Sequence, residues 1–241
     1  MIIAHQRSAS SLVSSSLNQH SQVIGFSELF VPGRIGFGVD GYDCFSEEIL
    51  NLRKKDPIKF LEQVIFTPHE NQIRAVGFKI FPDQIDNKDF DCVYKYLQEN
   101  KNIAVIKLKR INLLETYVSL QIANTDNVWG IWKSSQRTDI KITVNPEHMK
   151  NEFVKREKLD GKVNSFIEEH KKFEINYEEI AQNPSSAMMN IQKFLGIDIE
   201  PPSISSLKKE SRPMNEVIKN YKDLKKEFMS TRWASFFNDY N

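Results

Sequence analysis

A run of arginine and serine residues near the amino terminus has the composition of an anion-binding loop. An apolar strand, residues 1–4, precedes it, and a helical pattern begins within it. When a strand ends in a turn that opens a helix, free backbone N–H groups and the positive end of the helix dipole lie together. The arginine and the hydroxyls add side-chain donors for a phosphate or sulfate ester. The expected binding residues are Gln6, Arg7, Ser8, Ala9, Ser10, Ser11 and Leu12.

The composition limits the classes of protein that need to be considered. The chain has 241 residues, of which 40% are hydrophobic and 27% charged, as in an ordinary globular protein, and residues 1–241 are expected to form one domain. The net charge of +1 argues against nucleic acid as a partner. No run of about 18 apolar residues predicts a membrane span, and residues 1–4 are too short for a secretory signal. A cytoplasmic enzyme is therefore expected.

Cysteine and histidine residues give no metal-site pattern. Cys44 and Cys92 do not form a disulfide framework, and no Cys/His cluster has zinc-ligand spacing. The five histidines are scattered along the chain and are interpreted as structural. No metal is predicted.

Short apolar, β-rich runs alternate with amphipathic segments, which predicts a three-layer α/β fold with a mostly parallel central sheet flanked by helices. The predicted strands are residues 1–4, 76–80, 103–108, 140–144 and 173–176. The predicted helices are residues 10–20, 45–64 with an interruption at Pro57, 88–99, 113–123, 147–169, 185–195 and 216–229. The glycines of residues 33–38 follow no predicted strand, so they indicate a flexible turn rather than a dinucleotide fingerprint.

The residues of the first loop argue against a magnesium-ATP site. A Walker-type loop needs glycines, a lysine that reaches the outer phosphates and a hydroxyl that holds magnesium. Residues 6–12 contain neither glycine nor lysine.

The first loop instead resembles that of sulfotransferases that use 3′-phosphoadenosine 5′-phosphosulfate (PAPS), whose fold is similar to that of P-loop kinases. That loop commonly reads Arg-Ser-Gly-Ser/Thr-Thr/Ser-Leu-Leu, and residues 7–13 are similar except that Ala9 replaces the glycine. Such a substitution is tolerated without strain only if the turn uses a negative φ at this position.

A second segment resembles the 3′-phosphate segment of the same family. Arg110 follows the strand of residues 103–108, and Ser119 lies nine residues later in the next helix. An arginine can fork onto a phosphate while the serine hydroxyl donates from the helix. The spacing is similar to that of the bacterial carbohydrate, or trehalose-type, branch, which often carries a tryptophan where Trp129 lies.

Further segments extend the resemblance from residue 2 to about residue 233. Residues 25–30 look like the Gly-x-Pro-Glu-x-Phe segment, whose glutamate, here Glu28, acts as the catalytic base. Residues 173–196 look like the region near adenine, which makes Tyr177 an expected adenine contact. Lys208, Lys209 and Arg212 are expected to form a lid over the 3′-phosphate.

The resemblance implies in-line transfer of a sulfuryl group from PAPS to a hydroxyl acceptor, a carbohydrate or small alcohol, leaving adenosine 3′,5′-bisphosphate. Glu28 would take the acceptor proton, and Arg7 would meet the charge that develops toward the leaving 5′-phosphate. No metal is implied, because sulfuryl oxygens carry less charge than phosphoryl ones.

Other interpretations remain open at this level. The chain could be a phosphotransferase with an atypical nucleotide loop, or a catalytically silent relative that only binds a nucleotide. Arg7 and Glu28 could be surface charges, Arg110 a salt-bridged arginine, Ser119 a helix serine bonded to its own backbone, and Tyr177 a core aromatic. The lysines near residue 208 could form a solvated charge run. The acceptor and the oligomeric state are not determined by the sequence.

Overall fold

A computed structural model describes residues 1–31, 33–85, 88–126, 140–204 and 212–238. The chain divides into two compact units. The first unit is Met1–Lys109 with Leu159–Leu207, and the second is Arg110–Lys158 with Lys208–Asn241. Each unit has hydrophobic core residues of its own. The single domain expected from the sequence stays a prediction.

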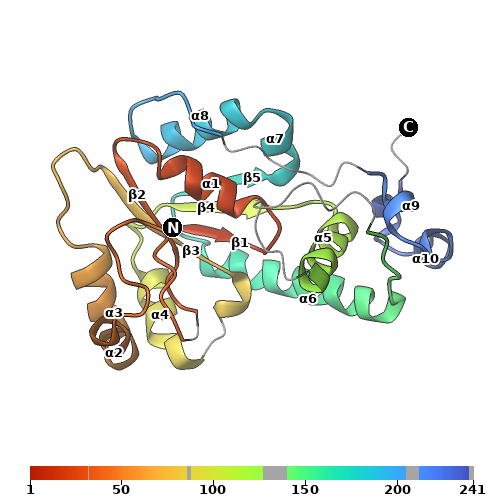
Figure 1. Ribbon diagram of the computed structural model, residues 1–241, viewed down its shortest axis with the longest axis horizontal. Helices are drawn as coiled ribbons and strands as arrows, with labels where there is room; N and C mark the ends of the chain where they lie inside the picture. Colours follow the sequence, from red (N-terminus) through yellow and green to blue (C-terminus); the bar gives the residue numbers. More distant parts are fainter. Residues whose placement is uncertain (32, 86–87, 127–139, 205–211, 239–241) are drawn as a thin grey trace. The chain divides into compact units, whose positions relative to one another are not determined.

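The first unit is built on a parallel sheet with strand order β2-β3-β1-β4-β5 (Figure 1). Every strand pair in it is parallel, as the alternation of strands and helices predicted. Because the strands are parallel, their carboxyl ends share one edge of the sheet. The strands are β1 Ile2–Ala4, β2 Val23–Glu28, β3 Ala75–Ile80, β4 Val105–Lys109 and β5 Lys172–Asn176.

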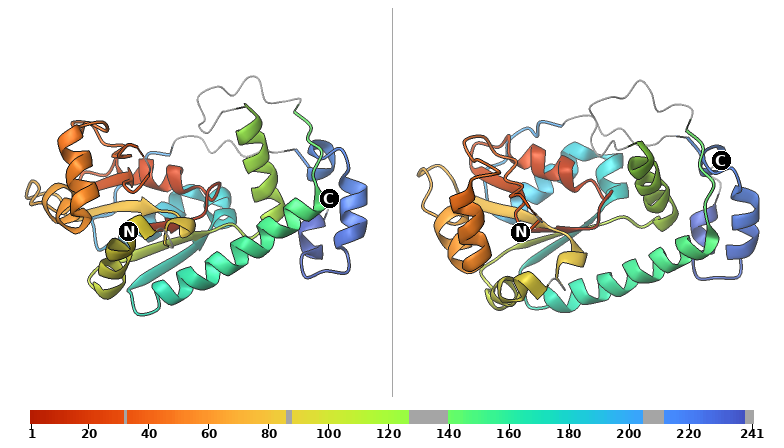
Figure 2. Two further views of the ribbon diagram at one scale, coloured as in Figure 1. Left: turned by 90° about the horizontal axis from the view of Figure 1, so that it is seen from below. Right: turned by 60° about the horizontal axis from the view of Figure 1, so that its bottom comes forward.

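Helices cover both faces of this sheet, which confirms the predicted layers (Figures 1 and 2). Successive strand residues point to opposite faces, so Ile2 and Ala4 belong to one core cluster and Ile3 to the other. The first cluster includes residues of α1 (Ser10–Leu17), α7 (Tyr177–Gln182) and α8 (Pro184–Leu195). The second includes residues of α2 (Glu47–Lys55), α3 (Pro57–Phe60), the π-helical turn Leu61–Ile65, α4 (Asp91–Glu99) and the end of α6 (Pro146–Phe166).

The second unit is helical in the part that the structure describes. Its core includes aromatic side chains that pack edge to face, with Phe153 against Trp233 and Phe228. Its elements are α5 Leu113–Asp126, the beginning of α6, α9 Met214–Val217, α10 Tyr221–Phe228 and the 3₁₀ turn Ala234–Phe237.

One strand predicted from the sequence is wrong, and one strand was missed. Residues 140–144 do not join the sheet; Ile142 makes only an isolated parallel bridge to Ile218, and both side chains pack in the second unit. Conversely, Val23–Glu28 forms the edge strand β2, although Gly25 and Ser27 weaken its apolar pattern. Tertiary packing, rather than β-propensity, decides both segments.

Two predicted helices are interrupted, the first at the predicted position next to Pro57. The helix expected over residues 45–64 breaks at Asp56, whose side chain caps α3 by accepting from the Lys59 N–H at 2.9 Å, with Pro57 as first helical residue. The helix expected over residues 216–229 breaks between α9 and α10, because Ile218 has extended backbone and bridges to Ile142. The helix expected over residues 88–99 begins with a 3₁₀ turn at Lys88–Phe90. The helix expected over residues 147–169 ends at Phe166.

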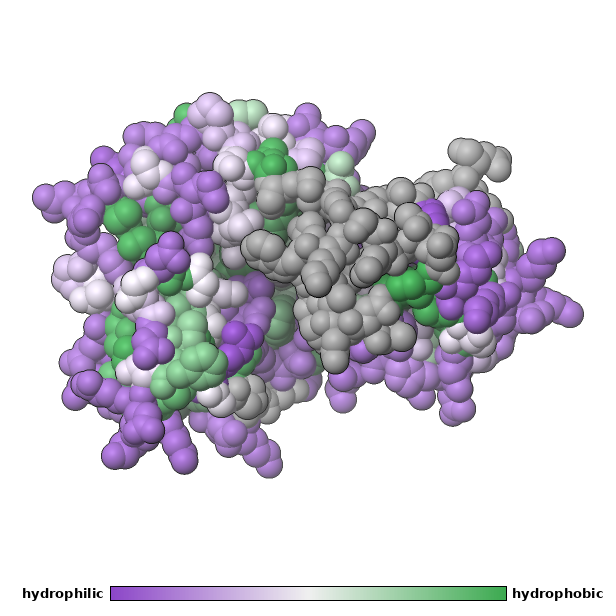
Figure 3. Space-filling model, viewed as in Figure 1, coloured by the Kyte–Doolittle hydropathy of each residue, from purple (hydrophilic) through white to green (hydrophobic). Residues whose placement is uncertain are grey.

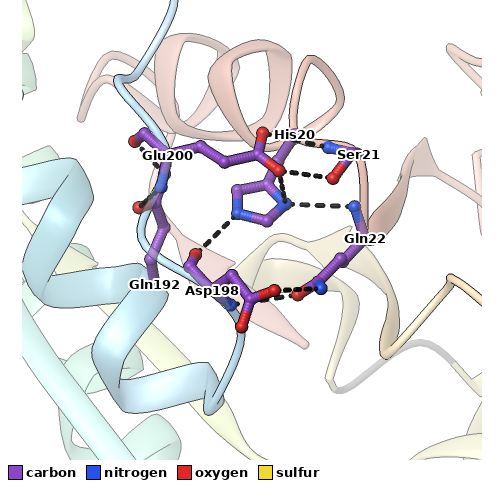
Figure 4. A network of polar contacts seen from close by, with 6 residues as sticks. All are labelled: His20, Ser21, Gln22, Gln192, Asp198 and Glu200. Carbon is purple, nitrogen blue, oxygen red and sulfur yellow. Dashed lines mark hydrogen bonds and ion pairs between the residues drawn. The ribbon is translucent and has the colours of Figure 1, made fainter.

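A polar network anchors the carboxyl end of α1 to the segment that follows α8 (Figure 4). His20 Nε2 lies 2.8 Å from the carbonyl oxygen of Asp198, and the Gln22 N–H donates to Nδ1 at 3.1 Å, so both ring nitrogens are hydrogen-bonded. Gln22 also donates from its side chain to the Asp198 carboxylate at 2.7 Å. This buried histidine is structural, and it holds the helix whose other end forms the predicted anion loop.

The described residues contain no helix that is long and apolar enough to cross a membrane. The face drawn in Figure 3 carries mostly hydrophilic residues where it is coloured. The large hydrophobic side chains that are exposed among the described residues are few, namely Phe45, Ile111, Val154, Ile199 and Met229.

Candidate functional site

The first loop connects the carboxyl end of β1 to the amino end of α1 through left-handed backbone. Arg7 has φ of 69° and Ala9 has φ of 66°, although neither is glycine. The Ser8 side chain is buried, and its hydroxyl donates to the carbonyl of His5 at 2.7 Å. The Ser8 hydroxyl hydrogen therefore closes the turn and is already used within the loop.

The loop presents the beginning of a helix with anion-binding character. Val13 N–H bonds back to the Ala9 carbonyl at 3.1 Å, so the N–H groups of Ser10, Ser11 and Leu12 precede the first intrahelical bond. Neither a side-chain cap on Ala9 nor an acidic residue in the first turn occupies this end of the helix. Together with the half-buried Arg7, the loop has the local geometry of a phosphate or sulfate site.

Glycine at position 9 is expected to stabilise the protein. A left-handed alanine costs about 1–2 kcal/mol relative to glycine, and the greater entropy of glycine in the unfolded chain offsets about 0.4–1 kcal/mol of that gain. We expect Ala9→Gly to raise the free energy of unfolding by about 0.5–1 kcal/mol in urea denaturation. An unchanged or lower stability would show that this turn does not strain the alanine.

Asp160 of α6 contacts residues at the carboxyl ends of β1 and β4, next to the first loop. Its carboxylate lies 3.0 Å from His5 Nε2, just after β1, and 3.8 Å from Lys109 Nζ, the last residue of β4. Burial alone would raise the pKa of Asp160, but the hydrogen bond and charge of His5 and the charges of Lys109 and Lys107 outweigh it and lower the pKa. This contact fixes the carboxyl ends of two adjacent strands where the loop begins.

Glu28 lies at the carboxyl end of β2, beside a buried lysine of β3. Lys79 Nζ is 2.7 Å from Glu28 Oε1, and the side chains are 3% and 21% exposed, respectively. The register places Gly25 opposite Gly77 but Glu28 opposite Lys79, so β2 carries one extra residue, a β-bulge. The bulge brings Glu28 beside Lys79 at the edge of the sheet that also carries the first loop.

The segment that follows β2 folds back on it and fixes the backbone of Glu28. The Gly36 N–H donates to the Glu28 carbonyl at 2.9 Å, and the Ser27 N–H donates to the Phe37 carbonyl at 2.7 Å. A Cβ atom at Gly36 would lie 2.7 Å from the Glu28 carbonyl oxygen, so only glycine allows this approach. Glu28 is thereby held on a rigid backbone.

Arg53 of α2 also holds this segment. Its guanidinium donates to the carbonyls of Leu29, Arg34 and Val31 at 2.5, 2.8 and 3.1 Å, and burial lowers the pKa of the side chain. A buried arginine on three backbone carbonyls organises residues 29–31 and 33–34, which are neither helix nor strand.

Arg53→Met is expected to lower the free energy of unfolding by about 2 kcal/mol or more, because one buried and two part-buried carbonyls would lose their donor. Urea denaturation measures the loss. The exposed Lys54→Met in the same helix is the control and should change stability by less than about 0.5 kcal/mol. Equal stability of both variants would contradict the role given to Arg53.

The remaining predicted binding residues occupy both units. Tyr177, in the first unit, opens α7 directly after β5 and is 5% exposed. Arg110 and Ser119 belong to the second unit: Arg110 is buried with Nη2 2.6 Å from Glu115 Oε2, and Ser119 is a half-buried residue of α5. Arg212 is half-buried. Lys208, Lys209 and Trp129 lie outside the described residues.

The structure adds positioning residues that sequence reasoning missed, chiefly Lys79 and Arg53. A lysine inside the apolar strand 75–80 was a usable signal, since a charge there must be paired when buried. Arg53 gave no such signal, because its partners are backbone carbonyls. The described residues contain no cluster of three or more His, Cys, Asp or Glu that could hold a metal ion.

Comparison with known proteins shows a shared fold. A sulfotransferase from Alicyclobacillus acidocaldarius matches with a TM-score of 0.50 and 14% identity, covering 98% of this chain and 91% of the other. The sulfotransferase domain from the curacin biosynthetic pathway matches with a TM-score of 0.51 and 14% identity, covering 83% and 74%. No family model and no curated protein matches the sequence. The chain therefore has a sulfotransferase-like α/β fold.

Proposed function

We propose that this protein is a PAPS-dependent sulfotransferase that transfers a sulfuryl group to a hydroxyl acceptor. The proposal rests on the arrangement of residues at the carboxyl edge of the parallel sheet. There the left-handed loop containing Arg7 opens a helix with free N–H groups after β1, and Glu28 ends β2. The fold shared with sulfotransferases supports the same assignment.

In the proposed reaction, the oxygen of the acceptor attacks sulfur in line with the bridging oxygen of PAPS. Glu28 accepts the hydroxyl proton, the new oxygen–sulfur bond forms, and the bond to the 5′-phosphate oxygen breaks. Arg7 and the N–H groups of Ser10, Ser11 and Leu12 stabilise the charge on the departing 5′-phosphate. The products are a sulfate ester and adenosine 3′,5′-bisphosphate.

The other donor-binding roles are also proposals. Arg110 and Ser119 would bind the 3′-phosphate and exclude donors that lack it, because a buried polar group without its partner is costly. Tyr177 would contact adenine, Gln6 and Ser8 would shape the loop, and Lys208, Lys209 and Arg212 would cover the 3′-phosphate. The acceptor would be a carbohydrate or small alcohol, as in the trehalose-type branch.

The proposal is tested by incubating the protein with ³⁵S-labelled PAPS and a panel of sugars, glycolipids and small alcohols. Label transferred to an acceptor, with release of adenosine 3′,5′-bisphosphate, is the expected result. Phosphoryl transfer from magnesium-ATP instead would favour the phosphotransferase. Tight binding of the bisphosphate without transfer to any acceptor would favour a silent relative.

A further inference from the structure

Two lysine–glutamate ion pairs join residues in register on neighbouring strands of the sheet, although Glu174 is 52% exposed and Lys107 also donates to Asn164 Oδ1 at 2.6 Å. Lys79 of β3 faces Glu28 of β2 in register, and Lys107 of β4 faces Glu174 of β5 in register. The nitrogen–oxygen distances are 2.7 and 2.9 Å, and both lysine side chains are less than 10% exposed. Only the first pair includes the proposed base. The second pair therefore shows how much such an ion pair contributes to stability alone.

The ammonium group of Lys79 is held by two contacts, an ion pair and a cation–π contact. Its Nζ lies 2.7 Å from Glu28 Oε1 and 5.3 Å from the centre of the Phe81 ring. The cation–π contact and the ion pair hold the lysine between β2 and the segment after β3. Since Glu28 is 21% exposed and Lys79 only 3%, the lysine approaches the carboxylate from the buried side.

We infer that Lys79 is a positioning residue that fixes the carboxylate of Glu28 for proton abstraction, an inference that rests on the proposed function. By binding Oε1, Lys79 restricts the rotamer of Glu28 and leaves Oε2 for the acceptor hydroxyl. The acceptor proton goes to Glu28, and Lys79 does not take part in the proton transfer. Misplacement of a base by about 1 Å is enough to cost about 100-fold in rate.

A double-mutant cycle separates this role from a structural one. Lys79→Met is expected to lower kcat about 10- to 100-fold in the wild-type background and less than about 2-fold in the Glu28→Gln background, since the lysine acts only through the carboxylate. The Kd for adenosine 3′,5′-bisphosphate should stay within about 2-fold. Lys79→Arg keeps a cation for Glu28 and should recover part of kcat.

Lys107→Met is the control, because it removes a buried strand lysine that is paired in register with a glutamate, Glu174, and also donates to Asn164. It should lower the melting temperature at least as much as Lys79→Met, because the bond to Asn164 is lost as well, while kcat should stay within about 2-fold. If Lys79→Met lowers kcat equally in both backgrounds, or no more than Lys107→Met does, the inference is wrong and the proposed function stands. If Glu28→Gln itself keeps full activity, the base assignment fails and the inference fails with it.

The ion pair also has a readout that needs no turnover. In ¹⁵N–¹H NMR spectra tuned to lysine ammonium groups, a buried paired Nζ exchanges slowly enough to be seen. We expect one such signal to vanish in Lys79→Met and to shift in Glu28→Gln, but not in Glu174→Gln. A spectrum in which Glu28→Gln moves no lysine signal would overturn the pairing.

Discussion

Glu28→Gln is expected to lower kcat for sulfuryl transfer by about 10²- to 10⁴-fold, the range for loss of a general base. The amide cannot take the hydroxyl proton, yet its oxygen still accepts from the ammonium of Lys79, so the buried lysine keeps a partner. Affinity for adenosine 3′,5′-bisphosphate should be nearly unchanged. Steady-state kinetics with calorimetry measure both quantities.

Glu174→Gln is the control for this variant, because it changes the same residue type in the in-register ion pair of β4 and β5. It should leave kcat within about 2-fold of the wild type. If Glu28→Gln weakens bisphosphate binding as strongly as it slows turnover, Glu28 is a binding residue rather than a base.

Arg110→Ala is expected to weaken binding of adenosine 3′,5′-bisphosphate by about 10- to 100-fold, since a charge-assisted hydrogen bond to phosphate contributes about 1.5–3 kcal/mol. Binding of AMP, which has no 3′-phosphate, should change by less than about 2-fold. The difference between the two ligands measures recognition of the 3′-phosphate by calorimetry.

Arg110 is buried against Glu115, so Arg110→Ala could also destabilise the fold. A second variant separates the loss of binding from a loss of stability. Arg110→Lys retains a cation for the glutamate but lacks the planar fork. It should fold like the wild type and still lose about 10-fold in bisphosphate affinity. Equal losses for AMP and the bisphosphate would remove Arg110 from the 3′-phosphate site.

The sequence predicted the parallel sheet flanked by helices and the turn between β1 and α1, because both depend on local patterns. Four of the five strands in the sheet that the structure describes follow from buried apolar runs, and the loop follows from the polar turn after β1. The edge strand β2 was missed because Gly25 and Ser27 dilute its pattern. Residues 140–144 look like a strand, but their alternating apolar residues pack in the second unit instead.

The details of the candidate site depend on tertiary contacts that no local pattern contains. Alanine normally avoids positive φ, so the left-handed backbone at Ala9 was not foreseeable from its identity. The bulge that places Glu28 beside Lys79 depends on the return of residues 35–37 along β2. The sequence could name Glu28 from the family resemblance, but its partner required the structure.

The most direct test of the sulfotransferase proposal is calorimetric titration without metal of adenosine 3′,5′-bisphosphate, compared in the same buffer with AMP and with magnesium-ATP. The proposal predicts clear preference for the bisphosphate, because a PAPS site must recognise both phosphates. Preference for magnesium-ATP would contradict the proposal and favour a phosphotransferase. If none of the three ligands binds, the protein has no nucleotide site and the proposal is wrong.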